Sequence, residues 1–212
     1  MKRLMIGLAM AVLPLMATTA SAQLLMKKYY DGRQDATYYL AGAVPERDGK
    51  IVFTKDIEAP GKSARDLFYK LGQWADLRYT PNTTRGEWTE ASFFHNYEYA
   101  GVTVADVDEG TLVCQGDEEL VFTNKVLNRD ATRTNYILRL SVRDGHVTAE
   151  ISQIYFTYVF VEEPERMAAE EWISDREAFD KKGRLLKSVA RFRVKTVDLK
   201  DELFKEIEEA VR

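Results

Sequence analysis

The 212-residue sequence contains one cysteine and two histidines, and this scarcity excludes several kinds of protein. A single cysteine cannot form an internal disulfide, so the core alone has to stabilise the fold. Metal-ligand spacings such as C-x-x-C and H-x-x-x-H are absent, as are the glycine-rich nucleotide motifs and the G-x-S-x-G motif of hydrolases. We therefore expect no metal, no other cofactor and no catalytic residue.

Long apolar runs are absent after residue 16, and no internal repeat or compositionally biased segment is visible. These absences exclude an integral membrane bundle, a solenoid and a disordered chain. The residues are 45% hydrophobic, 30% charged and 11% aromatic, so the chain can bury one good core. Its length favours a single domain.

The only long apolar stretch, residues 4–16, follows the cations Lys2 and Arg3 and precedes the small residues 20–22. This order is typical of a cleavable signal peptide, which we assign to residues 1–22. The apolar stretch would span about 20 Å as a helix, whereas the hydrocarbon core of a bilayer is about 30 Å thick. A permanent membrane anchor is therefore not expected.

The mature chain is then expected to begin at Gln23 and to be periplasmic or secreted. The only cysteine, Cys114, lies far from the cleavage site, so no lipid anchor is implied. Removing residues 1–22 deletes two of the 30 basic residues and none of the 34 acidic ones, which leaves a formal charge of −6. This balance disfavours nucleic acid as a partner.

Residues 23–38 are polar and rich in tyrosine, which suggests a lead-in before a single domain at 39–212. Local patterns in the domain predict a strand, an amphipathic helix, an antiparallel meander and C-terminal helices, in this order. Their expected ranges are 51–57, 63–77, 88–159, a helical stretch after Pro164, and a helix that begins at Asp198. The segment 184–197 fits both a helix and a strand, and this choice stays open.

Turn residues and alternation predict three details of the meander. An Asp-Gly dipeptide within 143–146 suits a tight hairpin. The apolar alternation slips after Ile151, which predicts a β-bulge near 152–153. Gly116 and Asp117 predict a further turn.

Together these elements describe an α+β domain in which helices cover one face of a curved antiparallel sheet. Five separate blocks of the sequence, in the same order along the chain, resemble a known family. The blocks are residues 39–45, 48–53, 60–63, 172–175 and 191–201. The family is catalogued as a domain of unknown function with a TBP-like fold, in exported proteins of gut-type Gram-negative anaerobes. The resemblance implies a TBP-like sheet gripped by helices and an exported location. It implies no activity and no catalytic residue.

The histidines and the acidic clusters give no specific signal for chemistry. His95 lies among aromatic residues, but no serine or cysteine nucleophile with a supporting acid is marked around it. His146 lies in the predicted hairpin turn and is expected in solvent. The acidic clusters 106–109 and 117–119 are expected in solvated turns, because the calcium-loop pattern is missing. Cys114 is expected to be a buried small hydrophobe.

The charge distribution is most uneven in residues 181–195, which contain seven cations and no acid. On one face of a strand, Arg191, Arg193 and Lys195 would form a row about 7 Å apart that suits phosphates or acidic polysaccharide. The alternative is a charged edge whose cations pair with nearby carboxylates.

Aromatic residues are the other resource for binding, because a sheet gripped by a helix can leave a concave apolar cavity in which small ligands bind. The candidate ligand-binding residues are Trp74, Phe94, Tyr97, Arg191 and Arg193. The sequence thus favours a non-enzymatic binding module for a hydrophobic or amphipathic ligand, or for an envelope protein. The alternatives are a protein-interaction or envelope-assembly module and, less favoured, an envelope hydrolase.

Overall fold

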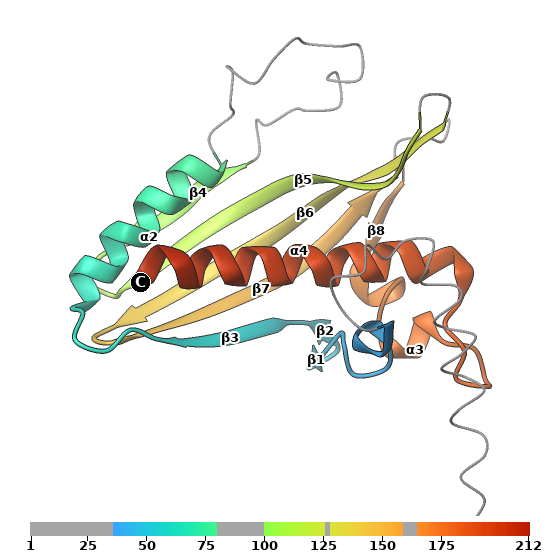
Figure 1. Cartoon of the computed structure of the whole chain (residues 1–212), viewed down its shortest axis with the longest axis horizontal. Helices are drawn as coiled ribbons and strands as arrows, with labels where there is room; N and C mark the ends of the chain where they lie inside the picture. Colours follow the sequence, from blue (N-terminus) through green and yellow to red (C-terminus); the bar gives the residue numbers. More distant parts are fainter. Residues whose placement is uncertain (1–35, 80–99, 126–127, 159–164) are drawn as a thin grey trace, which may run out of the picture.

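The structure, a computed structural model, describes residues 36–79, 100–125, 128–158 and 165–212. Figure 1 shows the elements, which in chain order are η1 (Ala36–Tyr39), β1 (Glu46–Arg47), β2 (Lys50–Ile51), β3 (Phe53–Glu58), α2 (Ala64–Tyr79), β4 (Gly101–Asp106), β5 (Thr111–Lys125), β6 (Asn128–Arg143), β7 (His146–Thr157), β8 (Arg166–Ala168), η4 (Ala169–Glu171), α3 (Asp175–Ala178) and α4 (Lys187–Val211). The signal peptide, nearly all of the lead-in and the first part of the predicted meander lie outside the described residues.

The main sheet is antiparallel and open, with the order β3-β7-β6-β5-β4, and β8 pairs with the far end of β7. Helices α2 and α4 lie on one face of this sheet (Figure 1). In β7, buried and more exposed positions alternate along the strand. One face is therefore core and the other carries polar side chains, which confirms the predicted α+β class with helices on one face.

The predicted helix at 63–77 is confirmed as α2 and extends two residues further. The Ser63 hydroxyl accepts a hydrogen bond from the Asp66 amide at 3.1 Å and donates one to the Asp66 carboxylate at 2.8 Å. This pairing satisfies a backbone N–H that the first turn of a helix leaves free. The amide of Ala64 is satisfied by the Asp144 carboxylate, 2.7 Å away, in the β6–β7 turn.

The predicted hairpin and bulge are both confirmed in β6 and β7. Gly145 has a φ of 69°, which suits the tight turn between the two strands. Further along, Asn135 pairs with Tyr155 while Ile137 pairs with Ser152, so β7 contains an extra residue. Gln153 takes up this residue with a φ of 52°. Because of the bulge, the apolar positions after it face the core again.

The predicted turn at Gly116 and Asp117 is wrong, because both residues lie inside β5. Gly116 pairs with Tyr136 of β6, and a Cβ atom on Gly116 would lie only 2.1 Å from the ζ carbon of the Tyr136 ring. The glycine is needed for this close approach of the ring, not for a change of direction. Asp117 is buried, and its Oδ1 accepts a hydrogen bond from Nε of Arg133 at 2.6 Å.

The rest of the second acidic cluster is also paired, so the expectation of a solvated turn there is wrong. Glu118 pairs with Arg78 at 2.6 Å, and Glu119 pairs with Arg129. The first cluster does lie at a turn, where the Asp106 carboxylate accepts hydrogen bonds from two backbone amides.

The helical stretch predicted after Pro164 is largely wrong, because Arg166–Ala168 forms strand β8 and α3 has only four residues. Pairing with β7 overrides the local pattern here. The Arg166 guanidinium also lies over the Tyr155 ring, 3.9 Å from its centroid. Tertiary contacts therefore decide the conformation of this segment.

The open choice at 184–197 resolves as a helix, since α4 runs without interruption from Lys187 to Val211. Asp198 lies inside this helix and does not begin it. Its carboxylate accepts a hydrogen bond from the Tyr39 hydroxyl at 2.7 Å, which ties the start of the domain to the helix.

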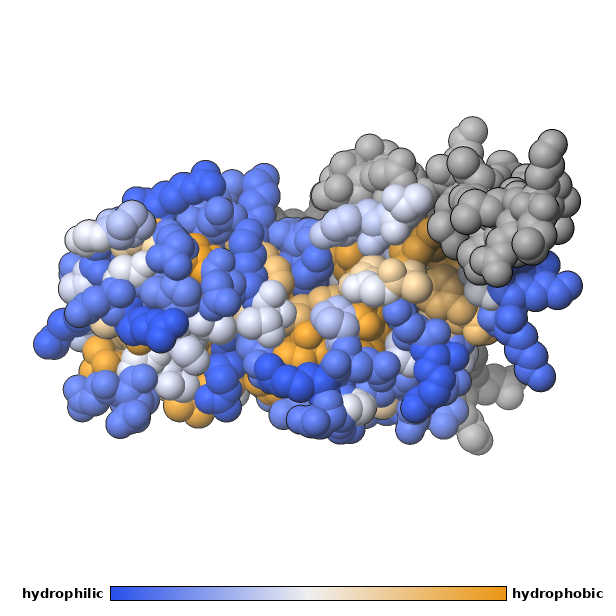
Figure 2. Space-filling model, turned by 90° about the horizontal axis from the view of Figure 1, so that it is seen from below, coloured by the Kyte–Doolittle hydropathy of each residue, from blue (hydrophilic) through white to orange (hydrophobic). Residues whose placement is uncertain are grey.

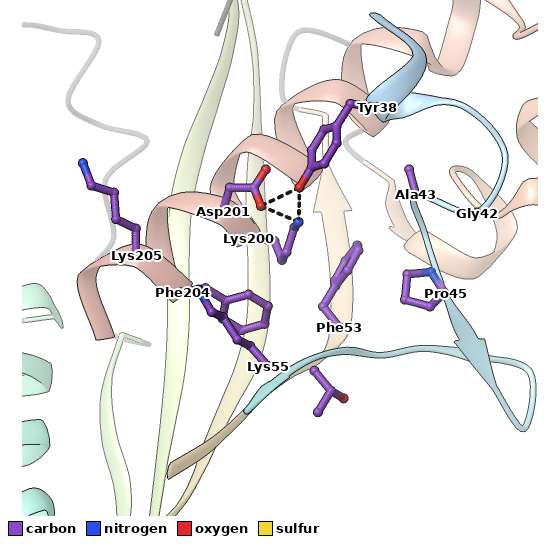
Figure 3. Close-up of a pocket in the computed structure, with 11 residues that line it drawn as sticks. Tyr38, Gly42, Ala43, Pro45, Phe53, Lys55, Lys200, Asp201, Phe204 and Lys205 are labelled. Carbon is purple, nitrogen blue, oxygen red and sulfur yellow. Dashed lines mark hydrogen bonds and ion pairs between the residues drawn. The ribbon is translucent and has the colours of Figure 1, made fainter. Parts of the chain in front are cut away.

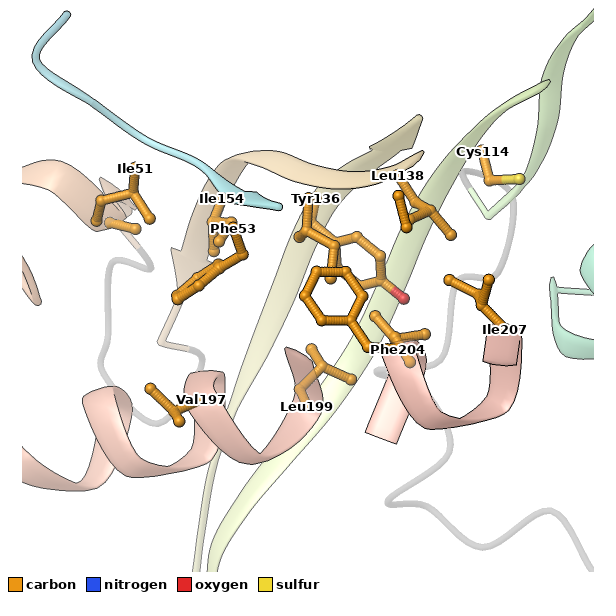
Figure 4. Close-up of a cluster of buried hydrophobic side chains, with 14 of the residues drawn as sticks. Ile51, Phe53, Cys114, Tyr136, Leu138, Ile154, Val197, Leu199, Phe204 and Ile207 are labelled. Atoms are coloured by element: carbon orange, nitrogen blue, oxygen red, sulfur yellow. The ribbon is translucent and has the colours of Figure 1, made fainter. Parts of the chain in front are cut away.

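The core lies between α4 and the sheet (Figure 4), where the helix buries side chains at helical spacing. Leu199, Leu203 and Ile207 are members of this stripe. Cys114 is buried on the facing side of β5, as predicted, and burial raises the pKa of its thiol to about 12. In the parts of the chain that the structure describes, no helix is long and apolar enough to cross a membrane.

Candidate functional site

The residues proposed from the sequence do not converge on one site. Phe94, Tyr97 and His95 lie outside the described residues. Trp74 is on α2, and its indole N–H donates to Glu206 near the end of α4 at 3.1 Å. Arg191 is close to the other end of α4, and fifteen helical residues correspond to about 22 Å. Trp74 and Arg191 therefore belong to different regions of the molecule.

Arg193 is fully buried and binds only within the chain. Its guanidinium donates to the backbone oxygens of Tyr39, Leu40 and Ile173 at 2.7, 2.6 and 2.5 Å. It also donates to Asp175 Oδ1 at 2.6 Å. Burial lowers the pKa of Arg193, and Asp175 opposes this shift. Arg193 thus joins three segments of the chain, in a place that no ligand in solvent reaches.

Arg191 is held within an aromatic cluster. Its guanidinium lies 4.9, 5.2 and 5.3 Å from the ring centroids of Phe122, Tyr158 and Phe192, and it pairs with Asp130. The row of cations that a strand would form is absent, because residues 187–211 are helical. Arg191 and Arg193 pair with Asp130 and Asp175, as the alternative with paired cations predicts. Residues two apart on a helix point in roughly opposite directions, about 200° around its axis, which separates Arg191 from Arg193.

A different cavity lies at the side of α4, and we call it the flank pocket. It has a volume of about 410 Å³ and opens between η1, the loop before β1, β3 and α4 (Figure 3). Its lining residues are Tyr38, Gly42, Ala43, Pro45, Phe53, Thr54, Lys55, Lys200, Asp201, Phe204 and Lys205. Seen from the side of β3, hydrophobic atoms reach the surface in the middle of this face, between polar flanks (Figure 2).

A polar triad occupies one end of the flank pocket. The Lys200 ammonium donates to the Tyr38 hydroxyl at 3.0 Å, and this hydroxyl donates to Asp201 Oδ1 at 2.9 Å (Figure 3). Lys200 also pairs with Asp201, and its Nζ lies 5.2 Å from the Tyr38 ring centroid and 5.9 Å from that of Phe53. The ammonium is thus held between aromatic rings and one carboxylate.

The rest of the rim carries two more lysines. Lys55 pairs with Glu208 at 2.8 Å and lowers the pKa of that carboxyl. Lys205 lies 3.7 Å from Glu209, and 76% of its side chain is exposed, so this pair is weak. The pocket therefore combines an apolar wall, formed by Phe53 with other lining residues, and a rim with hydrogen-bond donors.

The lining of the flank pocket contains no histidine, cysteine or serine. Its titratable groups are the Tyr38 hydroxyl, the Asp201 carboxylate and three lysine ammonium groups. Sequence reasoning missed Phe53, Lys200 and Asp201 as site residues. The one signal for them is that they lie in the blocks 48–53 and 191–201, which carry the family resemblance.

His146 differs from its expected setting, because only 15% of its side chain is exposed. Its Nδ1 lies 3.1 Å from Glu58, and its Nε2 lies 3.1 Å from Asp56. Hydrogen bonds from Thr148 and His146 lower the pKa of Asp56. Among the residues that the structure describes, no group of three or more His, Cys, Asp and Glu side chains could hold a metal ion.

Comparison with known families gives a match for the central part of the chain. Residues 53–157 match the family described as "Domain of unknown function (DUF4468) with TBP-like fold". No curated protein matches the chain.

Two crystal structures are similar over most of the chain. A DUF4468 family protein from Bacteroides ovatus ATCC 8483 is 34% identical, with a TM-score of 0.71, and the match covers 84% of this chain and 96% of that one. A TBP-like protein from Parabacteroides distasonis ATCC 8503 is 20% identical, with a TM-score of 0.62, and the match covers 79% of this chain and 96% of that one. The second likeness supports the fold alone.

Proposed function

Because the chain belongs to the DUF4468 family, whose description assigns a TBP-like fold and no activity, we propose a function from its own geometry. The protein is an exported, non-enzymatic binding module, and its flank pocket holds an amphipathic small molecule. The observation that carries this proposal is the pairing of an apolar wall with the Lys200 triad in one cavity of about 410 Å³. Pockets for small ligands range from about 300 to 1,000 Å³.

The two ends of the pocket suit the two ends of such a ligand. An apolar body packs against Phe53, Phe204 and Pro45, which line the cavity. A lysine ammonium has three hydrogens, and the Lys200 ammonium directs hydrogen bonds to Tyr38 and Asp201. Its third hydrogen is available to an acceptor on the ligand. The polar end of the ligand is thus expected to carry an oxygen acceptor, and a negative charge strengthens the contact.

Paired dyes test this proposal on the mature chain. The anionic dye is an anilinonaphthalene sulfonate, and the neutral dye of similar size is phenylnaphthylamine. Lys200→Met removes the ammonium and keeps an apolar side chain. Lys187→Met, at the exposed start of α4 and outside the pocket, is the matched control.

We expect Lys200→Met to weaken the anionic dye about tenfold, since one charge-assisted hydrogen bond contributes about 1.5 kcal/mol. The neutral dye should bind both variants with about the same affinity as the parent chain. The proposal fails if neither dye binds the native chain, or if the two lysine variants affect the anionic dye equally. Urea unfolding of each variant measures its stability. This control separates weaker dye binding that is due to a lost contact from weaker binding that is due to unfolding.

A further inference from the structure

A second cavity lies between α2 and the end of α4, and we call it the interhelix pocket. It has a volume of about 370 Å³ and shares no residue with the flank pocket. Its lining residues are Trp74, Leu77, Arg78, Glu206, Glu209 and Ala210. Leu77 is 84% exposed although it is a large apolar residue. An apolar surface with carboxylates beside it is thus open to solvent at the junction of the two helices.

A hydrogen bond and an ion pair hold the Glu206 carboxylate in this pocket. Oε2 of Glu206 accepts from the Trp74 indole N–H at 3.1 Å and lies 3.2 Å from Arg78 Nε. Both contacts fall on the same oxygen. In the described parts of the chain, the other oxygen, Oε1, has no hydrogen-bond partner. One carboxylate oxygen is therefore oriented by the protein and still free to accept.

The charges around Glu206 do not balance. The Arg78 guanidinium pairs with two carboxylates, those of Glu206 and, at 2.6 Å, Glu118. Glu209 lies one helical turn beyond Glu206. Within the described structure its carboxylate pairs with Lys205 alone, at 3.7 Å, and this exposed pair is weak. Burial raises the pKa of Glu206, even though Arg78 and Trp74 oppose the shift. The pocket is thus short of one positive charge.

We propose that the interhelix pocket binds a primary ammonium group attached to an apolar body, such as an arylalkylamine. The ammonium donates to Oε1 of Glu206 and to the Glu209 carboxylate. The apolar body lies on Trp74 and Leu77, and the indole also attracts a nearby cation. An anion is rejected because it would face two carboxylates. This site is independent of the function proposed for the flank pocket.

The test compares phenethylamine with phenethyl alcohol, which has nearly the same shape and no positive charge. The readout is the indole N–H resonance of Trp74 in tryptophan-labelled protein, identified by its loss in Trp74→Phe. The variants are Glu206→Gln and Glu209→Gln, which remove the charge and keep the size. Glu171→Gln, at an exposed position outside the pocket, is the matched control.

We expect the amine to shift the Trp74 resonance with a Kd of about 1 mM, which is typical of a small ligand with few contacts. Phenethyl alcohol should bind at least about fivefold more weakly, and Glu206→Gln should weaken the amine about tenfold, as loss of a charge-assisted contact does. The control and Lys200→Met should leave amine binding unchanged.

Three results would overturn the proposal. They are equal binding of the amine and the alcohol, unchanged amine binding in both glutamine variants, and no shift of the Trp74 resonance with millimolar amine. If Glu206→Gln loses its cooperative thermal unfolding, amine binding to Glu209→Gln decides whether the proposal holds. The Glu209 side chain is half-exposed and takes no part in the hydrogen bond between Trp74 and Glu206, so its replacement should leave the fold intact.

Discussion

Replacing Arg193 by methionine removes the most connected buried side chain of the described structure. The variant keeps much of the side-chain volume but leaves four acceptors without their donor. The Asp175 side chain is 36% exposed and regains water, and Leu40 is partly exposed. The carbonyls of Tyr39 and Ile173 belong to fully buried residues, so water does not replace the hydrogen bonds that they lose.

The magnitude follows from these two buried carbonyls. A buried acceptor without a partner costs about 1–3 kcal/mol, so we expect Arg193→Met to lose about 2–6 kcal/mol of stability. A domain of this size loses about 2–4 °C of Tm per kcal/mol, and a loss near the middle of that range lowers the Tm by about 8–16 °C. Such a loss is a large part of a total stability of about 5–15 kcal/mol.

Urea unfolding followed by circular dichroism measures this loss, with Arg184→Met as the matched control. Arg184 pairs with Asp180 at 2.7 Å but is 56% exposed, so its replacement should cost less than about 1 kcal/mol. Hydrogen exchange adds a local readout, because the amide of Gly42 donates to Asp175 Oδ2 at 2.6 Å. This amide should exchange faster in Arg193→Met. Equal stability of the two arginine variants would refute the reasoning, since the buried carbonyls would then not depend on Arg193.

The remaining predictions concern packing, thiol chemistry and processing. Gly116→Ala should cost about 1–3 kcal/mol in urea unfolding because its Cβ would overlap the Tyr136 ring, whereas Gly72→Ala, which meets no atom within 4 Å, should stabilise α2 by about 0.5–1 kcal/mol. A stable Gly116→Ala variant would show that the ring moves freely. With a pKa of about 12, the Cys114 thiol should not react with Ellman's reagent at about pH 8 until urea unfolds the chain. N-terminal sequencing of the mature protein should begin at Gln23, and a retained initiator methionine would contradict the signal peptide.

The parts of the fold that local patterns fix were predictable. Ser63 and the apolar spacing after it specify α2, and the Asp-Gly turn specifies the β6–β7 hairpin. The slip in alternation located the bulge at Gln153, because strand faces repeat strictly every two residues.

Long-range contacts decided the rest, and local patterns do not contain them. Gly116 resembles a turn residue, and only the Tyr136 ring from the next strand explains it. Arg193 resembles a surface cation, because the sequence does not show that backbone carbonyls from two distant segments surround it. The flank pocket also joins residues that are far apart in the sequence, such as Tyr38 and Lys200, which are separated by 162 positions. Such long-range contacts depend on the topology of the fold, which cannot be derived from short segments of the sequence.

The order of the elements along the chain affects how the protein is made. The 25 residues of α4 cover the apolar face of a sheet whose described strands all precede this helix. A ribosome adds about 5–20 residues per second, so that face waits for α4 for several seconds after the last of these strands has been made. Apolar strands that are exposed in this interval make the nascent chain prone to aggregation. Shortening α4 is therefore expected to lower the yield during biosynthesis as well as the stability of the finished fold.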